Sequence, residues 1–149
     1  MFGKRGQASF EYISVVAVAL ILIIPSTILF MNYTQNTGDE VLSNQLDFIG
    51  NTVMSEAEEM YVLGTDSWST VNVNLPNSFQ NAEIYNEQDL VFNYQSRRGP
   101  SQAVFFATRF NITEKGEDCT SSCELNLSRG SNELRIRSEG ETVTFETIN

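Results

Sequence analysis

Residues 13–31 read ISVVAVALILIIPSTILFM and follow the N-terminal stretch MFGKRGQASFEY, residues 1–12. No charged residue occurs between Glu11 and Asp39. As a helix, residues 13–31 would span about 28 Å at roughly 1.5 Å per residue, which is close to the ~30 Å hydrocarbon core of a bilayer. The stretch therefore predicts a single helix that can cross a membrane.

Charge on either side of the apolar stretch predicts its orientation. Lys4 and Arg5 lie just before it, and a long acidic remainder follows it. The positive-inside rule then places the N-terminus in the cytoplasm and the bulk of the chain outside. A cleaved secretory signal is the alternative, but the stretch exceeds the usual apolar region of about 7–15 residues. The small residues of Ala17-Val18-Ala19 also come too early for a cleavage site behind the stretch.

A short motif lies between the basic residues and the apolar stretch. Gly6 follows Lys4-Arg5, and the pattern Q-x-S-x-E-Y comes directly after it, formed by Gln7, Ser9, Glu11 and Tyr12. Over roughly the first 30 residues the chain closely resembles the class III signal peptide of archaeal type IV pilins. The resemblance implies that a prepilin peptidase cuts between Gly6 and Gln7, removes residues 1–6 as a leader and leaves the apolar segment in the mature chain, residues 7–149.

Glu11 has two interpretations. It sits at the membrane interface and helps to end the apolar segment, where a carboxylate in water or headgroups needs no further explanation. Alternatively, as the resemblance implies, Glu11 compensates the terminal amine that cleavage creates on a neighbouring subunit of a filament. An N-terminal Gln7 can cyclise and lose that charge, and Glu11 would then need hydrogen-bond donors such as Ser9.

Pro25 lies inside the apolar stretch. Because proline removes one backbone hydrogen bond and crowds the preceding turn, it predicts a kink or a short unwound stretch at residues 21–25. Such a kink is tolerated in membrane helices, and local melting would also let subunits pack in a filament core. Both interpretations stay open.

Beyond Met31 the sequence turns amphipathic, with apolar residues at intervals of three or four. Together with the apolar stretch this predicts one helix over about residues 9–63, about 80 Å long, with Gly38 and Gly50 as weak points. Residues 7–37 would serve the membrane or filament core, and residues 38–63 would cover a head. A coiled-coil stalk is the alternative, but the stripe lacks three or four clean heptads. The stripe consists of Leu42, Leu46, Ile49, Val53, Ala57, Met60 and Leu63.

After Gly64 the apolar period changes to two, which predicts half-buried strands. The segment Glu139-Gly140 separates two of them and indicates a tight hairpin. We expect about six or seven antiparallel strands in a head of residues 64–149, with one sheet face buried on the helix. The fold class is therefore α+β, a long N-terminal helix followed by a β-rich head as in type IV pilins. The apolar positions are Val71, Val73, Leu75, Leu90, Phe92, Tyr94, Val104, Phe106, Phe110, Ile112, Leu134, Ile136, Val143 and Phe145.

Two cysteines, Cys119 and Cys123, enclose three residues. Without histidine they cannot complete a tetrahedral zinc site unaided, and thioredoxin-type redox motifs have a two-residue spacer. The pair therefore predicts an extracellular disulfide that clips a loop.

Two surface features carry weaker signals. Asn32, Asn111 and Asn126 match the N-glycosylation pattern, but three matches are what chance supplies at this content of Asn, Ser and Thr. The segment Arg97-Arg98-Gly99-Pro100 is the basic cluster outside the leader. It fits a solvated turn between strands, or a contact to acidic patches of the next subunit, since the mature chain carries 7 basic and 19 acidic residues.

The composition excludes several function classes. The 149 residues include no His, and 9 basic residues stand against 19 acidic ones, a net charge of -10. A Ser/His/Asp or Cys/His triad and an imidazole metal site are therefore impossible, and the acidic balance disfavours nucleic acid as a partner. We expect no enzymatic activity, no metal site and no cofactor.

The resemblance implies a structural subunit, stored in the membrane with a cytoplasmic N-terminus and then polymerised through its helix into a surface filament used for adhesion. It also implies the partners, namely copies of the same chain, a prepilin peptidase, an assembly ATPase and a membrane platform. A minor pilin and a single-pass membrane-anchored binding domain are alternatives, and the anchored domain would keep its leader. A secreted or anchored enzyme is a further alternative, and it would need a set of catalytic residues. The sequence has many acidic residues, but their spacing identifies no pair as catalytic.

Overall fold

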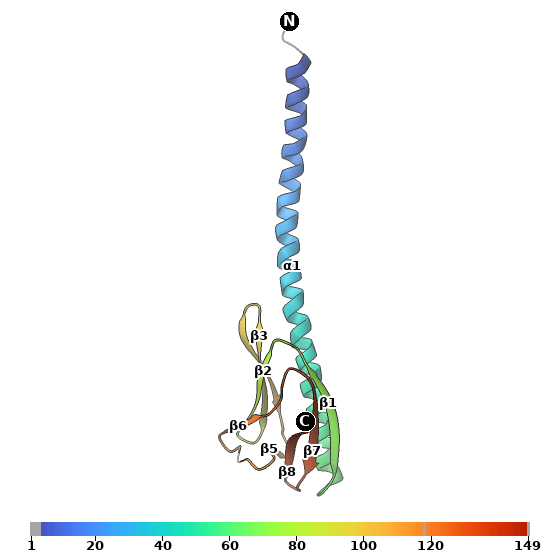
Figure 1. Cartoon of the computed structure of the whole chain (residues 1–149), viewed down its shortest axis with the longest axis vertical. Coiled ribbons are helices and arrows are strands. Elements are labelled where there is room, and N and C mark those ends of the chain that lie inside the picture. Colours follow the sequence, from blue (N-terminus) through green and yellow to red (C-terminus); the bar gives the residue numbers. More distant parts are fainter. Residues whose placement is uncertain (1–3, 118, 149) are drawn as a thin grey trace. The chain divides into compact units, whose positions relative to one another are not determined.

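The computed structural model describes the backbone of residues 4–117 and 119–148, and their side chains except in residues 4–10 and 35–37. These residues form one long helix followed by eight strands (Figure 1). The fold class is α+β, with an apolar N-terminal helix and a mainly antiparallel β head, as the sequence predicts. The elements are α1 (Lys4–Leu63), β1 (Trp68–Leu75), β2 (Phe79–Tyr85), β3 (Asp89–Ser96), β4 (Gly99–Phe106), β5 (Asn111–Glu114), β6 (Ser122–Leu125), β7 (Gly130–Ser138) and β8 (Thr142–Ile148).

Helix α1 continues through Pro25 without a break, so the unwound stretch expected at residues 21–25 is not present. The hydroxyls of the two residues after the proline are paired within the helix. The Ser26 hydroxyl donates to the Leu22 carbonyl at 2.7 Å, and the Thr27 hydroxyl donates to the Ile23 carbonyl at 2.8 Å. Such bonds to the fourth preceding carbonyl keep polar groups paired inside an apolar helix. The helix also begins at Lys4, earlier than the expected residue 9.

The chain divides into two units, Met1–Gly38 and Asp39–Asn149. In the second unit the stripe on α1 is buried together with the inner faces of the sheets, as its helical spacing predicts. Leu42 is half-buried against this core, and Leu63 is 65% exposed. The helix ends directly after it at Gly64, whose φ of 97° is the left-handed conformation typical of a helix C-terminus. The buried members of the stripe are Leu46, Ile49, Val53, Ala57 and Met60.

Within the described residues the head contains two four-stranded sheets. The sequence predicts one sheet with one face buried on the helix. The first sheet has the strand order β1-β7-β8-β5 and the second has the order β4-β3-β2-β6. The hairpin predicted at Glu139-Gly140 is confirmed, because β7 and β8 pair antiparallel there. One pairing departs from the antiparallel expectation, since β5 runs parallel to β8.

The inward face of β4 is the opposite of the predicted one. Ala103 and Phe105 are buried, whereas Val104 and Phe106 are 43% and 66% exposed. The register with β3 explains this, because Leu90 pairs with Phe105 and their side chains point to the same side of the sheet. Leu90 is fully buried.

Helix α1 closes the core against both the second sheet and the loop before β5. Gly50 lies under the ring of Phe105, so closely that a Cβ at residue 50 would overlap the ring. Tyr61 stacks on Phe110 with ring centroids 5.2 Å apart. Phe105 also makes an edge contact with Phe92 at 5.5 Å between centroids. These contacts fix the second half of α1 to the head.

Candidate functional site

The first candidate site is the apolar surface of α1. Its large apolar side chains from Tyr12 to Met31 are exposed, most of them by more than half. Within the described residues this is the one helix long and apolar enough to cross a membrane, and none of its most apolar 18-residue window is buried. A helix that is apolar all round needs apolar surroundings. The segment is therefore suited to anchor in a membrane or to pack against other helices.

The motif residues lie on the first turns of α1. Gly6, Gln7 and Ser9 belong to the helical backbone, but their side chains are outside the described residues, so the cleavage site between Gly6 and Gln7 stays a prediction. Glu11 and Tyr12 are exposed.

Helical geometry separates the two interactions considered for Glu11. Positions 7 and 11 are one turn apart and share a helix face, whereas positions 9 and 11 are about 200° apart around the axis.

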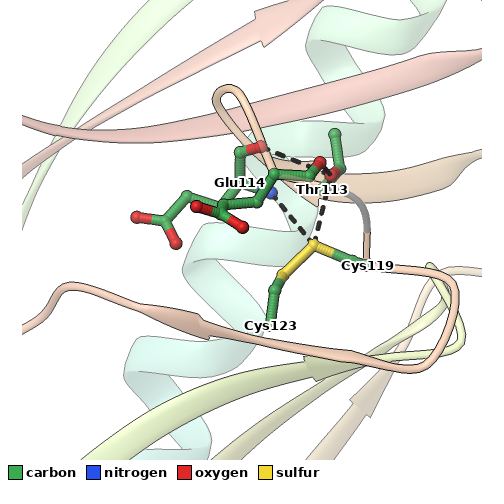
Figure 2. The surroundings of a disulfide bond; sticks show 5 residues. Thr113, Glu114, Cys119 and Cys123 are labelled. Carbon is green, nitrogen blue, oxygen red and sulfur yellow. Dashed lines mark hydrogen bonds between the residues drawn. A yellow bond between two sulfur atoms is a disulfide. The ribbon is translucent and has the colours of Figure 1, made fainter.

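The disulfide between Cys119 and Cys123 is present, and it links the loop that follows β5 to β6 of the second sheet (Figure 2). Cys119 is fully buried, and Cys123 belongs to β6 of the second sheet. From β5 of the first sheet, the Thr113 hydroxyl and the Glu114 backbone N–H donate to the Cys119 sulfur at 3.2 and 3.4 Å. The short loop is thus tied to one sheet covalently and to the other by hydrogen bonds.

Replacing Cys119 and Cys123 by serine is expected to lower the free energy of unfolding by about 2 kcal/mol, because the bond closes a short ring. Urea unfolding of the full chain in detergent micelles measures this. Reductant should shift the wild-type midpoint and leave that of the double variant unchanged. Equal midpoints for oxidised and reduced wild type would contradict a stabilising role.

Glu114 carries a perturbed carboxyl group beside this disulfide. Burial raises the pKa of Glu114, a hydrogen bond from the Asn126 backbone opposes the rise, and the nearby charges of Glu117 and Glu124 add to it. Because folding raises this pKa, the stabilising contribution is complete below the pKa of the unfolded chain and is lost as the pH rises through the raised value.

The variant Glu114→Gln is therefore expected to be more stable than the wild type at pH 7, by less than about 1 kcal/mol because the group is largely solvated. The difference should vanish as the pH falls below about 4. Unfolding midpoints measured across this pH range test the prediction, with Glu133→Gln on an exposed position of β7 as the control. A destabilised Glu114→Gln at pH 7 would contradict it.

The three glycosylation candidates differ in their surroundings. Asn32 and Asn126 are exposed, and Asn32 lies on the apolar helix. Asn111 is half-buried at the start of β5, and its side-chain nitrogen donates to a Glu87 carboxylate oxygen at 2.9 Å. A glycan on Asn111 would displace this hydrogen bond, so Asn126 is the most accessible acceptor in the head.

The turn Arg97-Arg98 between β3 and β4 has a partner within its own chain. The Arg97 backbone N–H donates to one carboxylate oxygen of Asp39 at 3.1 Å, and the Arg98 Nε lies 3.9 Å from the other. Both arginine side chains are exposed. The turn is therefore held to the helix by Asp39 and still presents its charges to solvent.

The geometry supplies an exposed apolar helical segment joined to a head stabilised by one buried core and a disulfide. Comparison with protein-family models, with curated proteins and with solved structures gave no match.

Proposed function

We propose that this chain is the structural subunit of an archaeal type IV pilus-like surface filament. A prepilin peptidase cuts between Gly6 and Gln7, the mature chain waits in the membrane, and α1 then polymerises with copies of itself. The observation that carries the proposal is the exposed apolar surface of residues 12–31 directly after the Q-x-S-x-E-Y pattern.

Physical chemistry supports storage in the membrane followed by assembly. About 20 exposed apolar residues in a helix satisfy a bilayer, and the same surface is buried when helices pack side by side. Both states keep it away from water, so the exchange between them leaves most of the hydrophobic stabilisation in place. Contacts between the different faces of successive copies do not close, so the assembly extends indefinitely.

The family resemblance supplies the remaining parts of the proposal. An assembly ATPase and a polytopic membrane platform move the subunit from the membrane into the filament, and the finished filament serves surface adhesion. The precursor keeps its N-terminus in the cytoplasm and its head outside. A minor pilin would use the same residues in fewer copies.

Blocking the cleavage site separates this function from a single-pass anchored binding domain. In cells that assemble the filament, Gly6→Val is expected to leave the chain uncleaved in the membrane fraction and to remove it from sheared surface material. The matched control is Ala8→Val, which places the same side chain two residues away at a variable position of the motif. An anchored binding domain would keep its leader and its location in both variants, and unchanged filaments from Gly6→Val would refute the proposal.

A further inference from the structure

A hollow of about 280 Å³ lies on the face of the first sheet that points away from the core. Its floor comes from strands in register, because Arg137 pairs with both Trp68 and Thr144, and Arg135 pairs with Glu146. Lys115 follows β5 and Glu139 follows β7 at its rim. We call this site the Trp68 hollow; its lining residues are Trp68, Lys115, Arg135, Arg137, Glu139, Thr144 and Glu146.

Charged side chains of both signs surround the Trp68 hollow. Lys115, Arg135 and Arg137 line it, and they are three of the seven basic residues that follow the leader in a chain of net charge -10. The lining has two glutamates against these three cations, and Asp66 beside the hollow pairs with Arg137. An anionic group that enters the hollow meets these three cations.

Carboxylates hold the cations in place. The Arg137 Nη2 donates to the Asp66 Oδ1 at 2.5 Å, which uses one of the five N–H donors of the guanidinium. Lys115 Nζ donates to one oxygen of Glu146 at 2.6 Å, and Arg135 Nη1 lies 3.7 Å from the other. These two cations and Arg137 lower the pKa of Glu146, the hydrogen bond from Lys115 most of all, so the carboxylate stays charged and fixes them. The Arg135 Nε is buried and has no hydrogen-bond partner among the described residues.

An exposed aromatic ring borders these cations. The Trp68 side chain is 60% exposed, and the Arg135 guanidinium lies 5.4 Å from its ring centroid. An exposed indole offers a flat apolar surface beside polar groups. A ligand that matches both features has an apolar ring face and a carboxylate at its edge.

We propose that the Trp68 hollow binds a carboxylated sugar, with the sugar ring on Trp68 and the carboxylate on Arg137 and Lys115. The volume is near the lower end for small-molecule pockets and fits one or two sugar rings. An acidic peptide fits less well. The floor strands β7 and β8 are paired on both sides, so they offer no free main-chain groups to an added strand.

Trp68 is the single tryptophan of the chain, so its fluorescence reports on this site alone. The full, unassembled chain in detergent micelles is titrated with trigalacturonate, which keeps the test independent of filament formation. A saturable change in fluorescence is expected, and the fully methyl-esterified trimer, which lacks the charges, should bind at least tenfold more weakly.

Variants test the residues. Arg137→Gln should weaken trigalacturonate binding at least tenfold, whereas Arg109→Gln, which removes an exposed arginine outside the hollow, should leave it unchanged. Trp68→Ala, followed by equilibrium dialysis with labelled trimer, should also weaken binding at least tenfold. No saturable binding, equal binding of the esterified trimer, or equally tight binding of hexaglutamate would each overturn the proposal.

Discussion

Replacement of Glu11 by alanine is expected to reduce the filament mass sheared from cells by at least about tenfold, while the chain remains in the membrane. The apolar residues 13–31 that drive insertion are unchanged in this variant. The loss arises at assembly, because an ammonium group left unpaired in an apolar filament core costs about 3–5 kcal/mol. Quantitative immunoblots of the sheared and membrane fractions measure both effects.

The matched control is Glu40→Ala, which removes another exposed carboxylate of α1 outside the motif. It should leave the filament mass unchanged. If Gln7 is cyclised, Glu11 pairs instead with donors of a neighbouring chain such as Ser9, and Glu11→Gln should then retain more filament than Glu11→Ala. Filaments from Glu11→Ala at wild-type yield would contradict the pairing.

Replacement of Gly50 by leucine is expected to lower the free energy of unfolding of the head by about 3 kcal/mol or more. Gly50 is buried under the Phe105 ring, and even a Cβ there overlaps ring atoms. Helix propensity alone predicts that replacing this glycine raises the free energy of unfolding, because glycine is about 1 kcal/mol worse than alanine in a helix interior. The sign of the effect therefore tests whether α1 packs on the second sheet through this contact.

Thermal unfolding of the full chain, followed by near-ultraviolet circular dichroism in detergent micelles, measures the loss. Gly38→Leu is the control, since it makes the same change at an exposed glycine of α1 and should leave the unfolding of the head unchanged. Adding Phe105→Ala to Gly50→Leu should recover part of the stability. A Gly50→Leu chain as stable as the wild type would contradict the packing.

The helical parts of the fold follow from the sequence because their signals are local. The apolar run specifies the first half of α1, and the spacing of Leu46, Ile49 and Val53 specifies the side of the second half that is buried. The nearby cysteine pair also predicts its own disulfide. In each case the residues that interact are close in the sequence or share one helical period.

The strands are less predictable because their faces depend on distant partners. Strand β2 has no clean alternation, since the register with β3 shifts between Phe79 and Asn81 and such a bulge changes which residues face inward. In β4, the residues on each of the two faces of the strand include apolar ones. The pairing with β3 turns Ala103 and Phe105 toward the core. The parallel pairing of β5 with β8 has no signal in the sequence.

The Trp68 hollow illustrates the same limit for a site. The alternation of Leu134 and Ile136 with Arg135 and Arg137 identifies the outward residues of β7, but it does not reveal what surrounds them. Trp68 lies almost 70 residues earlier in the chain and reaches Arg137 only through the pairing of β1 with β7. The site exists because of strand order, which no local pattern encodes.

The mature N-terminus tests the central claim most directly. Peptide mass spectrometry of material sheared from the cell surface is expected to find a chain that begins at Gln7, with that glutamine either free or cyclised. A chain in that material that begins at Met1, or a soluble chain cut after residue 31, would contradict the account. The head would then belong to an anchored or secreted binding protein.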